Sequence, residues 1–455
     1  MLELSIAEMG AALRKGDFTA VDLCQAHLDR IAEVDPEVRA FWVVLTDRAL
    51  AAAAQADSDF SMGVERGGLQ GIPFAIKDTV DVEGVATTCG SAVFADRIAA
   101  ADAAVVTMLC EQGAVPLGKV ATYDMGTVGP SFDLPHPAAR NPWNTGHITG
   151  GSSSGSAAAV AAGMVRVAIG SDTAGSIRSP SAYCGCVGIK SSFGTVPGDG
   201  VFSLAPSFDT VGALGATVHD AALLLDGMNG GAAASQIGQG INGLRIGYAR
   251  DWFAEDPQLD PAVLAAIDDA ASALSLLGAS ISQVTLPDYA LMEAVGAVIL
   301  HAEGLVLHLD KMRDATLPHG RKSYQSLAAG VMLTDDDLTA AQGLRPGLRA
   351  QVDALLTDHD AIITVTTLTT APPFAAFGAG AIWTPMRTLP FNVTGHPVLS
   401  VPVGFANGLP IGMQIVGRMQ DEKMLCRIGA AFEGGTDHGA AGRSGNGSPG
   451  AISQR

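Results

Sequence analysis

Positive charge is scarce in this sequence, and charge of either sign is sparse. The 455 residues include 27 Lys and Arg against 46 Asp and Glu, and 16% of all residues are charged, so the formal net charge is −19. Nucleic acids and anionic membranes are bound by clustered Lys and Arg side chains. The balance therefore argues against a nucleic acid or a membrane surface as a partner.

Long apolar runs are also missing. No uninterrupted apolar run approaches the length of about 20 residues that a membrane-spanning helix needs. The first residues, Met1–Ser5, do not combine a basic segment with an apolar block, so we expect no signal peptide.

Cysteine is infrequent and is not arranged in pairs. The six cysteines form no C-x-x-C cluster and lie scattered along the chain, at Cys24, Cys89, Cys110, Cys184, Cys186 and Cys426. Such a pattern favours reduced, buried thiols over disulfides and predicts a cytoplasmic protein. Cys184 and Cys186 have no second Cys or His pair nearby, which argues against a metal site.

Apolar residues and glycine are abundant instead. Hydrophobic residues make up 48% of the chain, and there are 55 glycines. A chain of this length and composition can bury a large core, which argues against a disordered protein. Residues 1–60 have the pattern of helices: Ser5 and Glu8 form an S-x-x-E capping box, and Thr19 marks a second helix start. We interpret this segment as an N-terminal helical scaffold.

From Gly71 onward, short apolar strands alternate with Ala-rich helices. Strands are predicted at 72–76, 114–117, 165–169, 361–365, 398–403 and 411–416, and helices at 103–111 and 156–162. This alternation predicts an α/β fold in which helices cover both faces of a sheet. Residues 230–245 resemble a flexible connection, and the mostly helical stretch 258–356 would form a cap over a pocket or a surface layer. The Gly/Ser-rich tail 434–455 is expected to be disordered.

Two short motifs resemble known active-site loops but lack their context. Gly113–Lys119 fits G-x-x-x-x-G-K, yet Val120 stands where a phosphate-binding loop needs Ser or Thr for magnesium. Gly151–Gly155 fits G-x-S-x-G, but turn residues rather than a strand precede it, which argues against a hydrolase nucleophile elbow.

Two runs of small residues give a denser signal. Gly150–Gly155 is a Gly/Ser run that leads into an Ala-rich helix, and Gly170–Pro180 follows about one strand later. Small side chains leave backbone amides open to a ligand, and successive N–H groups around Gly175 would suit an anion or an oxyanion.

These runs are part of a wider pattern that resembles the amidase signature family. The matching motifs cover nearly the whole chain in the family's order, at Gly71–Asp78, Asn141–Asn144, Gly150–Ser156, Asp172–Arg178, Phe391–Pro397 and Leu409–Gln414. The resemblance implies a single amidase-signature domain over residues 61–433, built on a mixed central sheet with helices on both faces. It also implies catalysis without a metal or an organic cofactor.

The family's Ser–cisSer–Lys triad maps onto three residues. Lys77 matches the strand-end lysine, Ser152 the bridging serine whose backbone is cis, and Ser176 the nucleophile, 24 residues after Ser152. A neutral hydroxyl attacks an amide poorly, so Ser176 needs a base. Lysine, whose usual pKa is ~10.4, serves as that base only where burial lowers its pKa. On the residues alone, Lys77 would be a solvated loop lysine paired with Asp78.

The resemblance also assigns residues around the triad. The family's oxyanion-binding amides fall on Thr173, Ala174, Gly175 and Ser176, and its supporting polar residues on Asp172, Arg178 and Ser153. Many members carry Gly where this chain has Ala174, a change that keeps the amide.

Less is implied about substrate recognition. By analogy with the family, Met125, Gly126 and Thr127 and the helical region 290–345 would line the substrate pocket. His301 and His308 are expected in core or surface positions rather than in catalysis.

The pattern predicts an amidase that hydrolyses the C–N bond of a small, non-peptide carboxamide through a seryl acyl-enzyme. The same chemistry serves carbamates (urethanes) and ureas, so a carbamate or urea-type hydrolase is an alternative. An alternative of another class is the A-type subunit of a tRNA-dependent amidotransferase, which needs partner subunits and an ammonia channel. The Gly-rich tail and the charge of −19 give that alternative no support. A small-molecule substrate is the expected partner, and a homodimer is left open.

Overall fold

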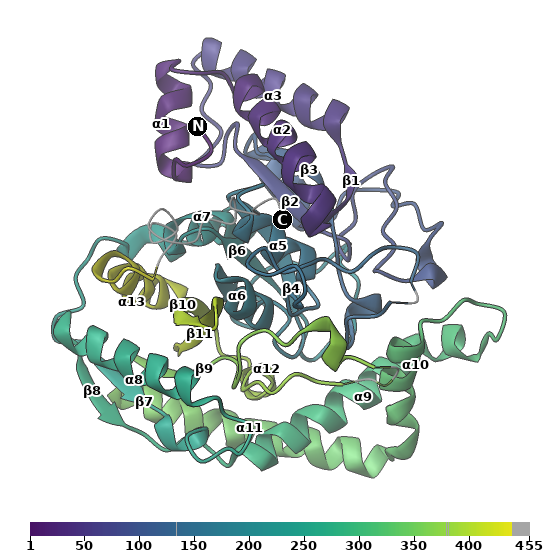
Figure 1. Ribbon diagram of the computed structural model, residues 1–455, viewed down its shortest axis with the longest axis vertical. Helices are drawn as coiled ribbons and strands as arrows, with labels where there is room; N and C mark the ends of the chain where they lie inside the picture. Colours follow the sequence, from purple (N-terminus) through teal and green to yellow (C-terminus); the bar gives the residue numbers. More distant parts are fainter. Residues whose placement is uncertain (133, 379, 381, 439–455) are drawn as a thin grey trace.

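One mixed sheet organises the chain (Figure 1). The computed structural model describes residues 1–132, 134–378, 380 and 382–438. The described strands follow the order β1-β3-β2-β4-β6-β5-β10-β11-β9-β7-β8 across the sheet. Their bounds are Phe41–Val44 (β1), Pro73–Lys77 (β2), Val115–Val120 (β3), Val167–Asp172 (β4), Val187–Lys190 (β5), Thr210–Gly215 (β6), Arg245–Tyr248 (β7), Ser280–Gln283 (β8), Ala361–Val365 (β9), Val398–Ala406 (β10) and Leu409–Val416 (β11). Strand β2 runs parallel to β3 and β4, whereas β10 and β11 form an antiparallel hairpin.

Helices cover both faces of this sheet. They are Ile6–Lys15 (α1), Ala20–Val38 (α2), Thr46–Ser61 (α3), Ala104–Glu111 (α4), Ser154–Ala161 (α5), Arg178–Cys184 (α6), Val218–Asn229 (α7), Pro261–Leu276 (α8), Tyr289–Arg313 (α9), Arg321–Ala328 (α10), Asp335–Asp358 (α11), Pro390–Thr394 (α12) and Glu422–Gly435 (α13). In β6, Gly212 lies against Ile177 beside α6, whereas Gly215 lies against Ala221 of α7. Residues three apart in a strand face opposite sides, so α6 and α7 lie on opposite faces. The predicted α/β fold is confirmed.

The segment 1–60 contains a strand as well as the predicted helices. α1 begins after Ser5, whose hydroxyl accepts a hydrogen bond from the Glu8 amide, and α2 begins after Thr19, as predicted. Between α2 and α3, however, Phe41–Val44 forms β1, which pairs antiparallel with β3. The helical interpretation is wrong at these four residues, because so short a stretch between two helices carries almost no periodicity.

Other boundaries also shift. The strand predicted at 165–169 is β4, Val167–Asp172, so Asp172 ends a strand. The predicted connection 230–245 holds a short 3-10 helix, Ala233–Gln236, and the helical stretch 258–356 is interrupted by β8. Helix α13 continues to Gly435, two residues into the predicted tail, and residues 439–455 of that tail lie outside the described residues. None of the six cysteines forms a disulfide within the residues that the structure describes, as predicted.

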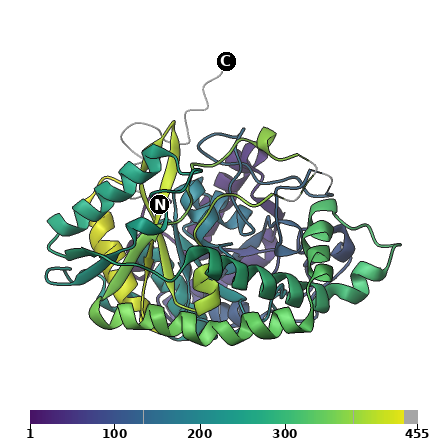
Figure 2. The same cartoon turned by 90° about the horizontal axis from the view of Figure 1, so that it is seen from below.

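Helix α9 is long and apolar. By length and composition it could cross a membrane, which the sequence pattern does not suggest because Glu293, His301 and Glu303 interrupt its apolar runs. In the fold it packs against α10, α11 and α12, and Met292 is fully buried. Figure 2, seen from below Figure 1, shows the green helices of this region lying across the molecule. We therefore assign α9 to the core of the fold.

Candidate active site

Lys77 and Ser152 meet beneath the edge where β2 and β4 end. Lys77 is the last residue of β2, and Ser152 lies two residues before α5, a helix that packs against β2 and β4. The ammonium nitrogen of Lys77 lies 2.8 Å from Ser152 Oγ and 2.9 Å from Ser171 Oγ. Two residues 75 positions apart in the chain are thus brought into direct contact.

The environment of Lys77 disfavours its charged form. The side chain is fully buried, and burial lowers the pKa of Lys77 to about 7, although the carboxylates of Asp172 and Asp209 partly oppose this shift. Asp78 is not its partner, because Asp78 forms an ion pair of 2.7 Å with Lys119 instead. The alternative of a solvated Lys77 paired with Asp78 is therefore wrong.

Ser152 is held by a tightly packed backbone. The peptide bond between Gly151 and Ser152 is cis, the geometry that the resemblance implies for the bridging serine. A Cβ atom at Gly151 would overlap the ring of Tyr123, so only glycine fits there. The Tyr123 amide also donates to the carbonyl of Ser152 at 3.2 Å. The position of the Ser152 hydroxyl is thereby fixed from both sides.

The loop that carries Ser176 depends on glycine as well. Gly175 has a φ of 126°, and a Cβ atom there would overlap Thr388 Oγ1, which donates to the Ala174 carbonyl at 2.6 Å. The amide of Ser153 donates to the Ser176 carbonyl at 3.1 Å. Ser153 therefore connects the segment of Ser152 to the loop of Ser176.

Three of the four predicted oxyanion donors are open. Within the part of the chain that the structure describes, the amides of Thr173, Ala174 and Ser176 make no hydrogen bond. The amide of Gly175 differs from the expectation, since it donates to Asp172 Oδ1 at 2.8 Å. Because this N–H is occupied by the carboxylate, the loop offers a ligand three amides rather than four.

Asp172 and Arg178 brace this loop from below. Both are fully buried, and Arg178 donates to the two oxygens of Asp172 at 2.8 and 3.0 Å. Asp172 also accepts from the amides of Gly175 and Ile177. Burial alone would raise the pKa of Asp172, but Arg178 outweighs it and holds that pKa well below its usual range.

Several contacts at the site are not evident from the sequence. Ser171 accepts from Lys77, and Asp209 accepts from Thr173 Oγ1 at 2.6 Å. Ser171 lies in the run Gly170–Pro180 but outside the family motifs, and no motif marks Asp209. Asn392 and Gln414, in contrast, lie within family motifs, and both bond to the Asp172–Arg178 pair. The two motifs therefore indicate that Asn392 and Gln414 matter, but they do not indicate that these residues bond to Asp172 and Arg178.

The predicted substrate residues are only partly at the site. Thr127 lines a small pocket with Ser176, whereas Met125 is buried in a neighbouring apolar cluster. A Cβ atom at Gly126 would lie 3.7 Å from Ser152 Oγ, so Gly126 borders the triad. His308 is buried, with its ring 3.0 Å from the Ser203 carbonyl, while His301 lines a second pocket.

Two pockets adjoin at the candidate site. The pocket that contains Ser176 has a volume of about 30 Å³, and the second pocket, lined by α9, has a volume of about 200 Å³. Ala174, Trp383 and Met386 line both. The candidate active site is therefore a small chamber at the serine that continues into a larger one.

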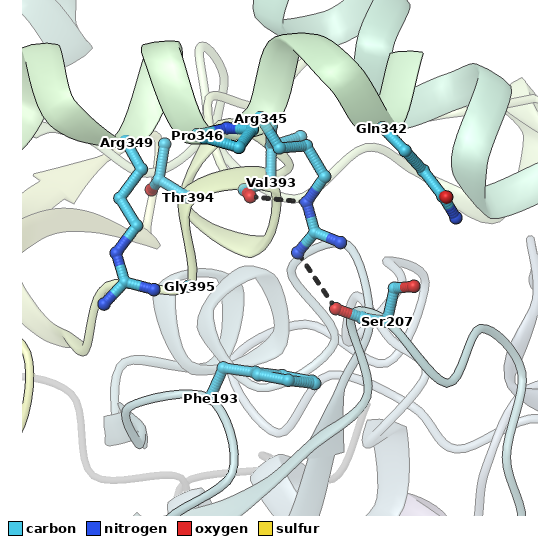
Figure 3. A pocket seen from close by; sticks show the side chains of 9 residues that line it. All are labelled: Phe193, Ser207, Gln342, Arg345, Pro346, Arg349, Val393, Thr394 and Gly395. Atoms are coloured by element: carbon cyan, nitrogen blue, oxygen red, sulfur yellow. Dashed lines mark hydrogen bonds between the residues drawn. The ribbon is translucent and has the colours of Figure 1, made fainter. Parts of the chain in front are cut away.

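A further pocket of about 430 Å³ lies away from these residues (Figure 3). Arg345 and Arg349 of α11 project into it above Phe193, and Arg345 donates to the carbonyls of Val393 and Ser207. None of the predicted triad or oxyanion residues lines it.

Comparisons with known proteins identify the family of this chain. A family model described as Amidase matches residues 22–426. The A-type subunit of the glutamyl-tRNA(Gln) amidotransferase from Roseiflexus sp. (strain RS-1) is 35% identical over 477 residues, which cover 96% of this chain and 97% of that protein.

Solved structures are similar over the same length. An inhibitor-bound vestigial protein complex, described as revealing the evolutionary origins of an s-triazine catabolic enzyme, contains a chain that matches with a TM-score of 0.88 and 32% identity, covering 95% of this chain and 98% of that one. The native peptide amidase of Stenotrophomonas maltophilia matches with a TM-score of 0.81 and 28% identity, covering 95% and 96%. This chain belongs to the amidase signature family of enzymes that act on C–N bonds.

Proposed function

We propose that this enzyme is an amidase that hydrolyses a small carboxamide through an acyl-enzyme on Ser176, with Ser152 as proton relay and Lys77 as base. The observation that carries the proposal is the buried contact of 2.8 Å between Lys77 Nζ and Ser152 Oγ. Lys77 makes no ion pair with a carboxylate among the described residues. A lysine held in this way can be neutral near pH 7 and accept a proton.

In the proposed reaction each residue of the triad has one task. Ser176 Oγ attacks the carbonyl carbon, and its proton passes through Ser152 Oγ to the neutral amine of Lys77. The amides of Thr173, Ala174 and Ser176 stabilise the negative oxygen of the tetrahedral intermediate. The intermediate collapses, and the leaving amine takes the proton back from Lys77 through Ser152. A water molecule then repeats these steps on the ester and releases the acid.

The size of the chamber at Ser176 favours a small leaving group. Its volume is about 30 Å³, and a water-sized molecule needs about 10–15 Å³. Ammonia fits this space, whereas an aniline does not. We therefore propose that primary carboxamides are the preferred substrates.

A panel of amides tests the function. The purified chain should release ammonia from primary carboxamides and act far more slowly on the matching anilides, with carbamates and ureas assayed in parallel. Released ammonia is measured for the primary carboxamides, and released aniline for the anilides; released amine or ammonia is likewise measured for the carbamates and ureas. Turnover of carbamates or ureas alone would replace the amidase with that alternative, and no turnover of any compound would contradict hydrolysis by the lone chain.

An amidotransferase component is the second candidate. Its support is the 35% identity, over nearly full length, to the A-type subunit of a glutamyl-tRNA(Gln) amidotransferase. That activity shares the ammonia-releasing half of the reaction, so the triad does not separate the two candidates. Purification of the chain from its own cells distinguishes the two candidates. The amidotransferase would be favoured if the chain copurified with a stoichiometric partner and released ammonia only when that partner was present. The same purification gives the oligomeric state and so tests the homodimer.

The activity is expected to depend on the protonation of Lys77. Burial lowers the pKa of Lys77 to about 7, and only the uncharged amine accepts a proton. Below this value kcat/KM should fall about tenfold for each pH unit, and above it kcat/KM should level off. The pH–rate profile of a primary carboxamide measures this inflection, and a flat profile between about pH 5 and 8 would contradict it.

Lys190 supplies the control. Burial also lowers the pKa of Lys190 to about 7, but its ammonium group donates to the carbonyls of Ser191 and His396. A Lys190→Met variant that folds should keep the inflection, and Lys77→Arg, whose side chain stays charged, should have no activity.

A further inference from the structure

The larger chamber continues directly from the oxyanion loop. Ala174, whose amide is one of the open donors, lines both chambers together with Trp383 and Met386. The carbonyl carbon of an amide carries two substituents, the acyl chain and the nitrogen. When the carbonyl oxygen is bound at Ala174, each substituent points either into the small chamber or into the larger one. Since the small chamber has room for little more than ammonia, the acyl substituent belongs in the larger one.

The larger chamber is narrow and mostly apolar. One face of α9 supplies one wall and the segment before α12 the other; the residues are Glu293, Ala297, Leu300, His301, Trp383, Met386 and Leu389. A cavity of about 150 Å³ holds a benzene ring. The volume of about 200 Å³ therefore accommodates one ring or a short unbranched chain.

Among the described residues that line this chamber, Glu293 is the only carboxylate. Tyr289 donates a hydrogen bond of 3.0 Å to Glu293 Oε2, and Glu293 makes no ion pair with any described residue. The charge of Arg387 favours the ionised form of Glu293, but Arg387 makes no ion pair with it, since Arg387 stacks 3.8 Å from the centre of the Tyr289 ring and donates to the Asp256 carboxylate. Burial raises the pKa of Glu293, as expected for a carboxylate without a full counter-charge.

His301 does not provide that counter-charge. It lies eight residues further along α9, and burial lowers its pKa, which favours the neutral ring. A half-buried carboxylate in a mostly apolar wall is costly unless donors and a cation meet it, and Tyr289 supplies only a neutral donor. The ligand itself is the remaining source of a cation in ion-pair contact.

We propose that the larger chamber binds the acyl group of the substrate and that Glu293 selects acyl chains that end in a positively charged amino group. The inference rests on the proposed function and names its substrate class, the primary amides of ω-amino acids. The apolar stem lies along Ala297 and Leu300, and the ammonium group replaces the missing partner of Glu293. The net charge of −19 further favours a cationic substrate over an anionic one.

Two amides of equal length test the selection. 5-Aminopentanamide carries an ammonium group where hexanamide carries a methyl group. The wild-type enzyme should prefer 5-aminopentanamide by roughly 10- to 100-fold in kcat/KM, the range of a charged hydrogen bond. In Glu293→Gln, which keeps the side-chain volume, the preference should fall to about one, through KM rather than kcat.

Glu303→Gln is the matched control. Glu303 lies on the same helix but accepts from the Ser207 amide at 3.0 Å, outside the chamber, so its loss should leave the preference intact. Equal turnover of the two amides by the wild type, or a preference that survives in Glu293→Gln, would overturn the inference while leaving amide hydrolysis in place.

A binding measurement separates this inference from the proposed function. Calorimetry with Ser176→Ala should show tighter binding of 5-aminopentanamide than of hexanamide, and the double variant with Glu293→Gln should lose the difference. Selective binding without turnover in the wild type would keep the inference and reject the amidase. Turnover without selective binding would reject the inference and keep the amidase.

Discussion

Replacement of Ser176 by alanine is expected to abolish amide hydrolysis while the protein stays folded. Ser176 is the only serine between β4 and α6, and the other hydroxyl of that loop, on Thr173, already donates to Asp209. Removal of the Ser176 hydroxyl leaves no atom to form the acyl-enzyme. Loss of a serine nucleophile lowers kcat by about 10⁴-fold or more. Ammonia release and the mass of an acyl-enzyme trapped with a slow ester measure the effect.

The control for this variant is another buried serine close by. Ser156 is fully buried in α5 and donates to the Ile169 carbonyl at 2.9 Å. Ser156→Ala should lose at most a modest amount of stability, about 1 kcal/mol, and keep its activity. If Ser176→Ala still turned over amides, or still gained the mass of the acyl group, Ser176 would not be the nucleophile.

Replacement of Arg178 by methionine is expected to give the largest loss of stability. Arg178 is fully buried and donates to Asp172, Asn392, Gln414 and the Thr388 carbonyl. Without it, the carboxylate of Asp172 stays buried without its ion-pair partner. Breaking a buried ion pair in this way costs about 3–5 kcal/mol of the free energy of unfolding. Denaturant unfolding and thermal melting measure the loss.

Two further variants identify the cause. Arg349 forms a pair of 3.8 Å with Asp353 in which both side chains are about half exposed, so Arg349→Met should cost no more than about 1 kcal/mol. The double variant Arg178→Met, Asp172→Asn removes the unpaired charge and should recover part of the stability of Arg178→Met. A double variant no more stable than Arg178→Met would mean that packing, not charge, is responsible.

Much of the fold was predictable because its signals are local. The capping boxes at Ser5 and Thr19 and the short apolar strands identify their own elements. The motifs likewise identify Lys77, Ser152 and Ser176 as a set. The exception at β1 is physical, since Phe41–Val44 is a strand only because β3 lies beside it.

The contacts around the triad were not predictable in this way. Whether Asp78 pairs with Lys77 or with Lys119 depends on which side of its strand each lysine faces once β2 and β3 are neighbours. The donation from the Gly175 amide to Asp172 depends on how the loop folds over that carboxylate, which the motif does not reveal. Glu293 reaches the site only because α9 lines the larger pocket, and in the sequence it is far from every motif. Such partners are decided by tertiary packing.

During synthesis the sheet stays divided until the chain is almost finished. The hairpin of β10 and β11 is the last part of the sheet to be made, yet it lies in the middle, with β5 on one side and β9 on the other. Before Val398 emerges, a nascent chain has two separate half-sheets, each with an unpaired edge. Such edges pair readily with other chains. The hairpin therefore joins the two half-sheets only at the end of synthesis. A chain truncated before it is expected to aggregate rather than to fold as a shorter enzyme.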